Sequence, residues 1–443
     1  MSFDEPGANK RREFLKASAL VAGGVMLNGV AFAGGAAHSS VDDTIKIALI
    51  GCGDRGTGAA FQALNTKQNL KLVAMADAFA DRLEKAHGLL SEKYGAKVDV
   101  PKERRFVGFD AYKQAIALAD VVLLATPPGF RPWHFEEAIA QNKHVFMEKP
   151  VAVDSPGVRK VLATAKLAEQ KKLNVVVGLQ RRYQTSYRDT MKRIHDGAIG
   201  DITGGQVYWN SGGVWVKQRE PNQTEMEYQM RNWYYFNWLC GDHITEQHIH
   251  NIDIANWIKN AHPVSVQGTG SRAWRTGKNY GEIYDNHSVE LTYADGAVIH
   301  SQCRHFEGID NRVDESFQGT KGRVLFDAGA NRGRIWDTKG KQVFDYSAKT
   351  NANPYQTEHD ELFEAIAKGE YKFKDAERGA ISSMTSIIGR YATYSGKKIS
   401  WDEALNANNS LFPDQLSWTA NPKVMPDANG LYPIPTPGKT KVI

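Results

Sequence analysis

The sequence predicts an α/β chain of two domains, in which a doubly wound parallel sheet is followed by an α+β domain with a large, mostly antiparallel sheet. An apolar, β-branched run at 44–50 leads directly into a glycine-rich turn and a helical pattern, as a parallel strand and its crossover helix do. Comparable apolar runs recur up to residue 178, and alternating segments with Gly and Asp turns follow them. The 443 residues are enough for two domains with separate cores.

The amino-acid composition is that of a globular chain, with 42% hydrophobic and 24% charged residues. The formal net charge of +5 is spread along the chain with no block of like charges, which argues against a dedicated nucleic-acid or membrane-surface role. The three cysteines, Cys52, Cys240 and Cys303, include no CxxC pair. They therefore predict neither a disulfide framework nor a thiolate zinc site.

The N-terminus has the pattern of an export signal. Residues 10–16 read KRREFLK, small apolar residues fill 17–30, and residues 31–33 read AFA, a possible cleavage site. The arginine pair followed by xFLK resembles the twin-arginine signal, which implies export in the folded state to the periplasm by the twin-arginine machinery. The alternatives are a basic amphipathic helix or a membrane anchor, but the apolar stretch is short and rich in Gly and Ala for about 30 Å of hydrocarbon.

A dinucleotide-binding turn follows the first predicted strand. Residues 51–56 read GCGDRG, a GxGxxG pattern between the strand at 44–50 and a helical pattern. Gly51 permits the tight turn, Gly53 leaves room for a pyrophosphate, and Gly56 allows the helix to pack closely on the strand. The cofactor contacts expected in this turn are Gly51, Gly53, Asp54, Arg55 and Gly56.

The second predicted strand, 72–76, ends in Asp77, about twenty residues past the turn. A carboxylate at this place accepts hydrogen bonds from the adenosine ribose and repels a 2′-phosphate, so the pattern favours NAD over NADP. The alternative for the whole pattern is an ordinary glycine turn before a helix.

Two further strands are predicted at 120–125 and 143–147, and a polar residue follows each at the edge where a doubly wound sheet binds its ligand. Thr126 and Glu148 are therefore expected beside the cofactor. His134, in a helix predicted between the two strands, either caps that helix or contacts the cofactor.

The second of these strands ends in the tripeptide Glu148-Lys149-Pro150. Together with the GxGxxG turn, this tripeptide resembles the glucose–fructose oxidoreductase and inositol dehydrogenase (Gfo/Idh/MocA) family, from about Ile45 to Leu405. The resemblance implies that Lys149 lies beside the nicotinamide and the reacting sugar carbon. A lysine at the edge of a parallel sheet is also well placed to exchange a proton with a hydroxyl group. The alternative is a solvated lysine paired with Glu148.

A second motif of this family, GxHxxD with an acid four residues before the histidine, has a counterpart here. His250 and Asp253 match HxxD, Glu246 takes the place of the family's aspartate, and His248 replaces its usual glycine. If 242–257 is one helix, as its apolar pattern predicts, Glu246 and His250 are neighbours on one face, where the carboxylate orients the imidazole as a proton acceptor. The alternative for His250 is a buried histidine with structural contacts.

The remaining candidates are substrate and metal ligands. His243, His248 and His250 are spaced by five and two residues and do not share a helical face as HxxxH ligands do, so no metal site is predicted. Arg182 and Tyr183 follow the last predicted parallel strand. They are expected to line the substrate site together with His248, or else to pack a loop.

These patterns divide the chain into five parts. A hairpin signature at 289–301 and an exposed sheet face in the second domain favour a homodimer or homotetramer, as in the resembled family. The parts are the export signal and linker (1–40), the Rossmann domain (41–178), the substrate and oligomerisation domain (179–350), helices returning to the first domain (351–405) and an irregular tail (406–443).

The prediction is an exported NAD(P)-dependent oxidoreductase in which Lys149, Glu246 and His250 remove a proton from a sugar or glycoside hydroxyl. Because free dinucleotides are not expected to be regenerated outside the cytoplasm, we expect a tightly bound cofactor. The rival is a redox-neutral glycoside hydrolase or lyase that acts through transient oxidation at C3. The chain resembles that subgroup in its signal, its GDRG loop and residues 400–405, but lacks its THGxGP stretch. A non-catalytic sugar sensor is the third interpretation.

Overall fold

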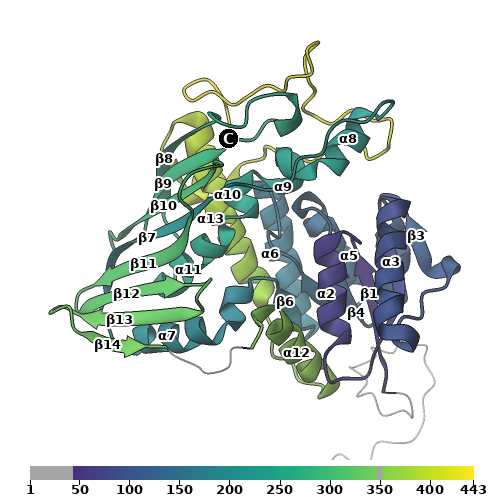
Figure 1. Ribbon diagram of the computed structural model, residues 1–443, viewed down its shortest axis with the longest axis horizontal. Coiled ribbons are helices and arrows are strands. Elements are labelled where there is room, and N and C mark those ends of the chain that lie inside the picture. The colour runs from purple at the N-terminus through teal and green to yellow at the C-terminus, as the bar shows by residue number, and fades with distance from the viewer. Residues whose placement is uncertain (1–42, 347–351) are drawn as a thin grey trace, which may run out of the picture. The chain divides into compact units, whose positions relative to one another are not determined.

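The computed structural model describes residues 43–346 and 352–443, whose elements build two sheets joined by helices (Figure 1). The predicted export signal in residues 1–40 lies outside the described residues. Within the described ranges, none of the helices combines the length and the hydropathy that a bilayer span needs.

The first sheet has six strands, all parallel, as predicted for this part of the chain. Its order β3-β2-β1-β4-β5-β6 places the reversal of winding between β1 and β4, which is where ligands of such sheets bind. Most strand residues are buried because helices cover both faces, which explains the continuous apolar runs in the sequence. The strands are β1 (Ile45–Ile50), β2 (Leu70–Asp77), β3 (Arg105–Val107), β4 (Val121–Leu124), β5 (His144–Met147) and β6 (Val175–Val177).

Helices from two distant parts of the sequence cover the first sheet. One face packs against α2 (Asp54–Leu64), α3 (Ala80–Tyr94) and α12 (Pro354–Ala367), and the other against α4 (Ala111–Ala117), α5 (Arg131–Ala140) and α6 (Ser155–Gln170). Leu362 and Phe363 of α12 are buried in one cluster with Ile47 and Leu49 of β1. The late helix α12 therefore completes the core of the first domain.

The second sheet has nine strands in the order β14-β13-β12-β11-β7-β10-β9-β8-β15, and only its β7–β10 pair is parallel within the described residues. The predicted hairpin is β9–β10, with Leu291 opposite Ile299. The strands are β7 (Ile202–Ser211), β8 (Ser265–Ser271), β9 (Asn286–Thr292), β10 (Val298–His305), β11 (Arg312–Gly319), β12 (Gly322–Asp327), β13 (Arg332–Asp337), β14 (Gln342–Asp345) and β15 (Ile399–Ser400).

The helix α13 (Asp375–Ser395) lies between the two sheets and joins them (Figure 1). It packs against α6 of the first domain and against β8 and β9 of the second, and nearly all of its residues are buried. One of the hydrophobic clusters of the described residues therefore runs through both domains. The remaining helices are α7 (Thr185–His195), α8 (Glu225–Arg231), α9 (Asn237–Cys240), α10 (His243–Glu246), α11 (Ile249–Lys259) and α14 (Trp401–Asn406).

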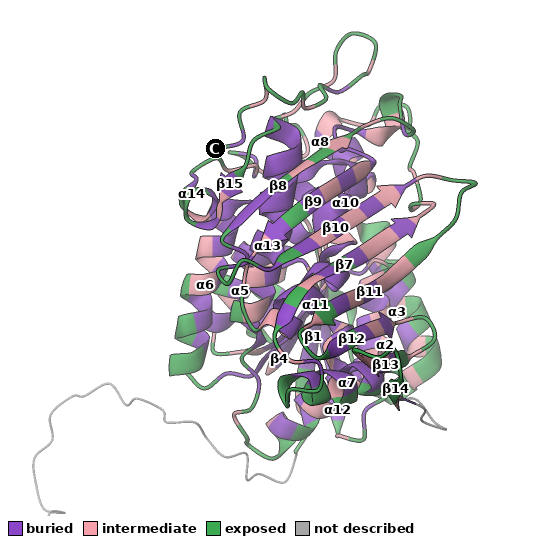
Figure 2. Cartoon of the chain, turned by 90° about the vertical axis from the view of Figure 1, so that its left-hand side faces the viewer, coloured by how far each residue is buried: buried purple, intermediate pink, exposed green. Residues whose placement is uncertain are grey.

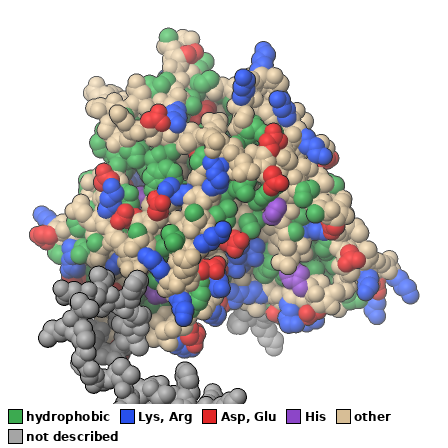
Figure 3. Space-filling model, turned by 180° about the vertical axis from the view of Figure 1, so that it is seen from behind, with side chains coloured by type: hydrophobic (Ala, Val, Ile, Leu, Met, Phe, Trp, Pro, Cys, Tyr) green, Lys and Arg blue, Asp and Glu red, His purple; other side chains and the backbone are tan. Residues whose placement is uncertain are grey.

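The other face of the second sheet is turned outward (Figure 2). Along β9 and β10, buried side chains alternate with accessible ones, and Ser288, Glu290, His300 and Gln302 are accessible polar positions. Homo-oligomer formation through this face stays a prediction. On the face shown in Figure 3, acidic and basic side chains are interspersed.

The predicted single helix over 242–257 is wrong, because the chain breaks between α10 and α11. The carbonyl of Glu246, which in a continuous helix would accept from the amide of His250, instead accepts a hydrogen bond from Lys149 Nζ. The amide of His248 reaches back to the carbonyl of His243 at 3.1 Å. A tertiary contact therefore replaces the helical bond at this point.

Candidate active site

A cavity of about 460 Å³ opens at the C-terminal edge of the first sheet. Ile50, Ala76 and Ala125, at the ends of β1, β2 and β4, line one side of it. The second domain supplies the opposite wall. The residues of that wall are Trp215, Lys217, Met230, Arg231 and Trp233. The cavity therefore lies where open parallel sheets bind ligands, and both domains contribute to it.

The glycine turn before α2 fits a dinucleotide phosphate. Gly51 has φ +94°, and a Cβ on Gly56 would lie 1.9 Å from the Gly51 carbonyl oxygen, so both positions need glycine for the fold itself. A Cβ on Gly53 would have no described atom within 4 Å, so the backbone there borders open space. No side chain of the described residues caps the start of α2, which leaves its first amides free to bind phosphate.

Asp77 lies at the end of β2 and lines the same cavity. Its Oδ2 accepts from the amide of Cys52 at 2.6 Å, and its Oδ1 accepts from the amide of Phe79 at 2.8 Å. Burial raises the pKa of the carboxyl group. Each oxygen keeps a further lone pair, so the fixed carboxylate can accept a hydrogen bond from a ribose hydroxyl.

Thr126 and His134 lie side by side in the cavity, with 3.2 Å between Oγ1 and Nδ1. Burial, followed by the charge of Arg131, lowers the pKa of His134 to about 3, so the imidazole is neutral at pH 7. Phe130 occupies the N-cap of α5. His134 therefore does not cap the helix; it lines the cavity, and its contact with the cofactor stays a prediction.

Arg131, which sequence reasoning missed, holds the turn after β5. Its guanidinium donates to the Glu148 carbonyl at 3.0 Å and to the Thr126 carbonyl at 2.6 Å. The Glu148 side chain is not part of the cavity wall; it accepts from Arg55 Nε at 2.5 Å and so positions Arg55, which does line the cavity with Asp54. A cation in the first turn of a helix interacts unfavourably with the helix dipole. An arginine at this position was therefore the signal in the sequence that pointed to a special role for Arg131.

Lys149 joins the two domains beside this turn. Its Nζ lies 2.9 Å from Oε1 of Glu246 and also donates to the Glu246 carbonyl oxygen. The two side chains are 11% and 12% exposed, so the pair is largely removed from water. The structure therefore pairs Lys149 with Glu246 on α10, and the alternative pairing with Glu148 does not form.

His250 lies in the first turn of α11 and is buried against Trp209, with ring centroids 5.9 Å apart. Burial, followed by the charges of Lys149 and Arg181, lowers the pKa of His250 well below 6.5. Its Nδ1 has no hydrogen-bond partner among the described atoms. The imidazole is therefore neutral near pH 7, and its unpartnered Nδ1 is itself buried.

The three predicted substrate residues lie elsewhere. His248 is fully buried, with its Nε2 2.8 Å from the hydroxyl of Ser301. Arg182 makes two hydrogen bonds of 2.8 Å to Asp253, the acid of the HxxD motif. Tyr183 is buried, and its hydroxyl donates to Asp375 at 2.8 Å. None of the three lines the cavity, because burial and ion pairing fix them in the protein interior.

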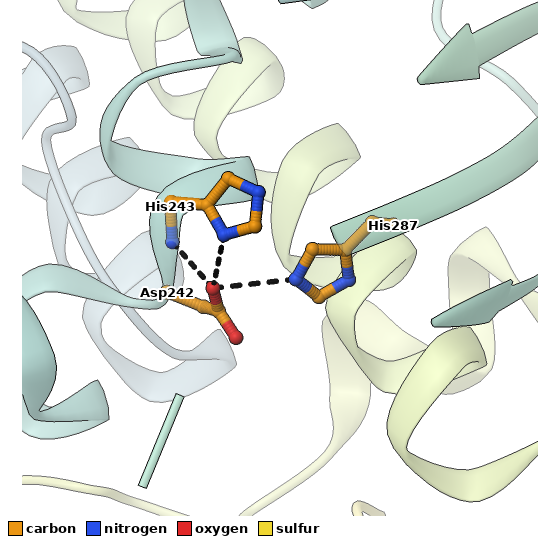
Figure 4. Close-up of side chains that lie close together, drawn as sticks. All are labelled: Asp242, His243 and His287. Atoms are coloured by element: carbon orange, nitrogen blue, oxygen red, sulfur yellow. Dashed lines mark hydrogen bonds and ion pairs between the residues drawn. The ribbon is translucent and has the colours of Figure 1, made fainter. Parts of the chain in front are cut away.

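The three histidines weighed as metal ligands contact different groups within the described structure. Instead, His243 and His287 converge on Asp242, with nitrogens 3.0 and 3.2 Å from its Oδ1 (Figure 4). The Asp242 carboxylate also accepts from the hydroxyl of Tyr394 and, at 3.0 Å, from the amide of Tyr284. Although burial opposes it, Cys303 and Asp242 raise the pKa of His243 to about 10. This buried hydrogen-bonded network fixes the start of α10.

Two profiles of one protein family match this chain. A family profile described as the NAD-binding Rossmann fold of an oxidoreductase family, Gfo/Idh/MocA, matches residues 45–179. The profile of the Gfo/Idh/MocA C-terminal domain matches residues 187–325. The two matched ranges correspond to the two domains that border the cavity.

Three relatives with a named activity differ in how much of this chain they match. Inositol 2-dehydrogenase of Rhizobium meliloti is 30% identical over 285 residues, which cover 63% of this chain and 75% of that protein. A glycosyl hydrolase family 109 protein of Streptomyces coelicolor is 28% identical over 165 residues, or 37% of this chain and 33% of that protein. The structure of scyllo-inositol dehydrogenase from Lactobacillus casei with NAD(H) and scyllo-inositol has a TM-score of 0.61 at 20% identity, covering 81% of this chain and 99% of that one.

Proposed function

The chain belongs to the Gfo/Idh/MocA family of NAD-binding oxidoreductases, and we propose that it oxidises a hydroxyl group of a sugar or glycoside. The observation that carries the proposal is the contact between Lys149 and Glu246 across the two domains, beside the neutral imidazole of His250. The glycine turn and Asp77 line the cavity that would hold the cofactor, whereas Lys149, Glu246 and His250 are not among the residues that line it. The similarity to an inositol dehydrogenase supports a cyclic polyol or sugar as the substrate class.

The residues divide the proton chemistry between them. NAD, when bound, supplies the hydride acceptor. His250 takes the hydroxyl proton, because its lowered pKa keeps the imidazole neutral near pH 7. The Lys149 ammonium donates a hydrogen bond to the same oxygen and stabilises the negative charge that develops there. Glu246 holds Lys149 in this orientation from two of its oxygens.

We further propose that the protein is exported to the periplasm and keeps its cofactor bound. The support is the KRREFLK sequence at residues 10–16 and the AFA sequence at 31–33. A protein exported in the folded state can carry a dinucleotide that it loaded in the cytoplasm. A captive cofactor then has to be oxidised and reduced in place, which suits a reaction between two sugars.

The test is to purify the mature protein, denature it and identify the released nicotinamide by mass spectrometry. We expect about one NAD per chain, and turnover of inositols or aldoses followed through NADH absorbance or, for a captive cofactor, through conversion of a second sugar. A chain that holds no dinucleotide and does not bind added NAD or NADH contradicts the proposal. A chain that binds NAD but converts no sugar or polyol contradicts the substrate class only.

A second candidate is redox-neutral cleavage of a glycoside, which the similarity to the glycosyl hydrolase family 109 protein favours. That similarity covers a third of the relative, so it reaches only part of that protein. Release of nitrophenol from aryl glycosides without an added acceptor distinguishes cleavage from net oxidation. If no nitrophenol is released but NADH is formed from the same sugars, the cleavage candidate is excluded and the dehydrogenase proposal remains.

A further inference from the structure

At one end, the cavity is lined by residues that come from three distant parts of the chain. Phe79 and Phe109 line it from the first domain, directly after β2 and β3. Met230 and Arg231 of α8 line it from the second domain. Phe79 follows Asp77 by two residues and donates its amide to that carboxylate, so this is the loop that carries the predicted ribose ligand.

Arg231 fastens α8 to this loop. Its guanidinium makes two hydrogen bonds to Asp81, of 2.7 and 2.9 Å, and lies 3.8 Å from the centre of the Phe79 ring. Arg231 is the last residue of α8, and Asp81 lies in the first turn of α3. Each charge is therefore opposite in sign to the partial charge of its helix end, which stabilises both residues. The loop is therefore held by a two-point ion pair and by stacking on one side chain.

The C-terminal tail holds the same loop from behind. Trp418 packs against Phe79 and Phe109, with ring centroids 5.0 and 4.5 Å apart. The tail is itself bound to α8, because Tyr432 donates to Glu225 at 2.6 Å and the Val424 carbonyl accepts from Gln229 at 2.8 Å. The loop, α8 and the tail therefore form one connected cover over this end of the cavity.

We propose that Arg231 and Trp418 are positioning residues that keep the dinucleotide in its cleft by fixing residues 77–81, the connection from β2 into α3, against α8 and the C-terminal tail. The inference rests on the proposed function, since it assumes that NAD occupies this cavity. It goes beyond it by assigning cofactor retention to residues outside the nucleotide-binding domain. Neither residue belongs to the glycine turn or to the Lys149–Glu246–His250 group, so retention is separable from chemistry.

The experiment measures the rate at which NADH leaves the full-length protein. The protein is loaded with NADH, mixed with excess NAD, and followed by the change in NADH fluorescence. Arg231→Ala and Trp418→Ala are each expected to raise the dissociation rate constant about tenfold, which corresponds to about 1.4 kcal/mol. Because both residues hold one loop, the double variant is expected to fall short of the product of the two effects.

Two matched control variants keep the test specific. Arg312→Ala removes an arginine that makes a comparable two-point ion pair, with Asp314 of its own strand β11, and stacks on Tyr208 away from the cavity, and Trp274→Ala removes a tryptophan that is 57% exposed. Both controls are expected to release NADH at the wild-type rate. Exchanging the charges, as Asp81→Arg with Arg231→Asp, is expected to restore part of the retention lost in Arg231→Ala.

Each result decides the inference. Release at the wild-type rate from both folded test variants overturns it, although NADH binding itself stands. Equal acceleration in the controls also overturns it, because the effect is then a general loss of packing. If Arg231→Ala does not fold, Arg231→Lys keeps the charge without the two-point contact, and wild-type release from that variant overturns the role of Arg231. A wild-type protein that binds no NADH contradicts the proposed function instead.

Discussion

The two sides of the candidate site differ in what brings their residues together. On the cofactor side, Gly51, Asp77 and Thr126 line the cavity and each lies at or directly after the end of a parallel strand, so their meeting follows from sheet topology. On the proton-transfer side, Glu246 and His250 are not among the residues that line the cavity, and they lie on opposite sides of a helix break. The cofactor side is thus specified locally, whereas the proton-transfer side depends on contacts across the domains.

The two sides also differ in chemistry. The glycine turn offers backbone amides and open space to an anion. The opposite side offers a buried ion pair and an imidazole whose charged form is suppressed. This division assigns cofactor binding to one side and proton transfer to the other, and it can be tested one residue at a time.

The largest expected effect comes from Lys149→Ala, which removes the contact between the edge of the first sheet and Glu246 of α10. We expect kcat to fall about 10³-fold, within the range for a positioned acid or base, while NADH affinity changes little. Initial rates and NADH titration measure the two quantities. Lys160→Ala, which removes a 2.7 Å surface ion pair with Glu136, serves as the control. Equal loss of NADH affinity and of kcat contradicts the division between a cofactor-binding side and a proton-transfer side.

A smaller effect, about 10²-fold in kcat, is expected for His250→Gln. In the wild type the acid limb of the rate profile lies below pH 6.5, because the folded protein lowers the pKa of His250. The same shift means that the unfolded chain takes up the proton first, so this contribution to stability is present above about pH 6.5 and is lost as the pH falls below it. The pH dependence of kcat and the urea midpoints, each measured from pH 5 to 8, test the rate prediction and the stability prediction. An acid limb that is unchanged in His250→Gln excludes His250 as the group that accepts the proton.

The glycine turn offers a matched pair on the cofactor side. Gly56→Ala places a methyl group 1.9 Å from the Gly51 carbonyl oxygen and is expected to cost about 2–3 kcal/mol of stability. Gly53→Ala meets no described atom within 4 Å and is expected to leave stability unchanged while weakening NADH binding about tenfold. Urea unfolding and NADH titration separate the two effects. Normal NADH binding by Gly53→Ala places the phosphates elsewhere.

The smallest effect is expected for Tyr183→Phe, which tests a residue that sequence reasoning placed in the substrate site. The structure buries its ring and gives its hydroxyl one bond, to Asp375. Loss of that bond is expected to cost about 1 kcal/mol of stability with KM unchanged. A raised KM with unchanged stability restores Tyr183 to the substrate site.

The sequence by itself determined the elements whose signal is local. The parallel strands, the GxGxxG turn and the Asp77 position were predicted because a buried strand is an apolar run and its end fixes where the next polar residue lies. Lys149 was placed at the sheet edge for the same reason. The glycine turn and Asp77 need only their own strands to reach the cavity.

Only the tertiary structure decided the contacts between distant segments. Periodicity predicted one helix at 242–257, but Lys149 takes the carbonyl that the helix would have used, and the chain breaks there. Arg182 was expected either to line the substrate site or to pack a loop, and the structure pairs it with buried Asp253, away from the residues that line the cavity. The cover formed by Arg231 and Trp418 joins residues more than 130 positions from the loop they hold, and no local pattern encodes such a meeting. Burial and charge pairing across the fold, which the linear sequence does not display, decide these positions.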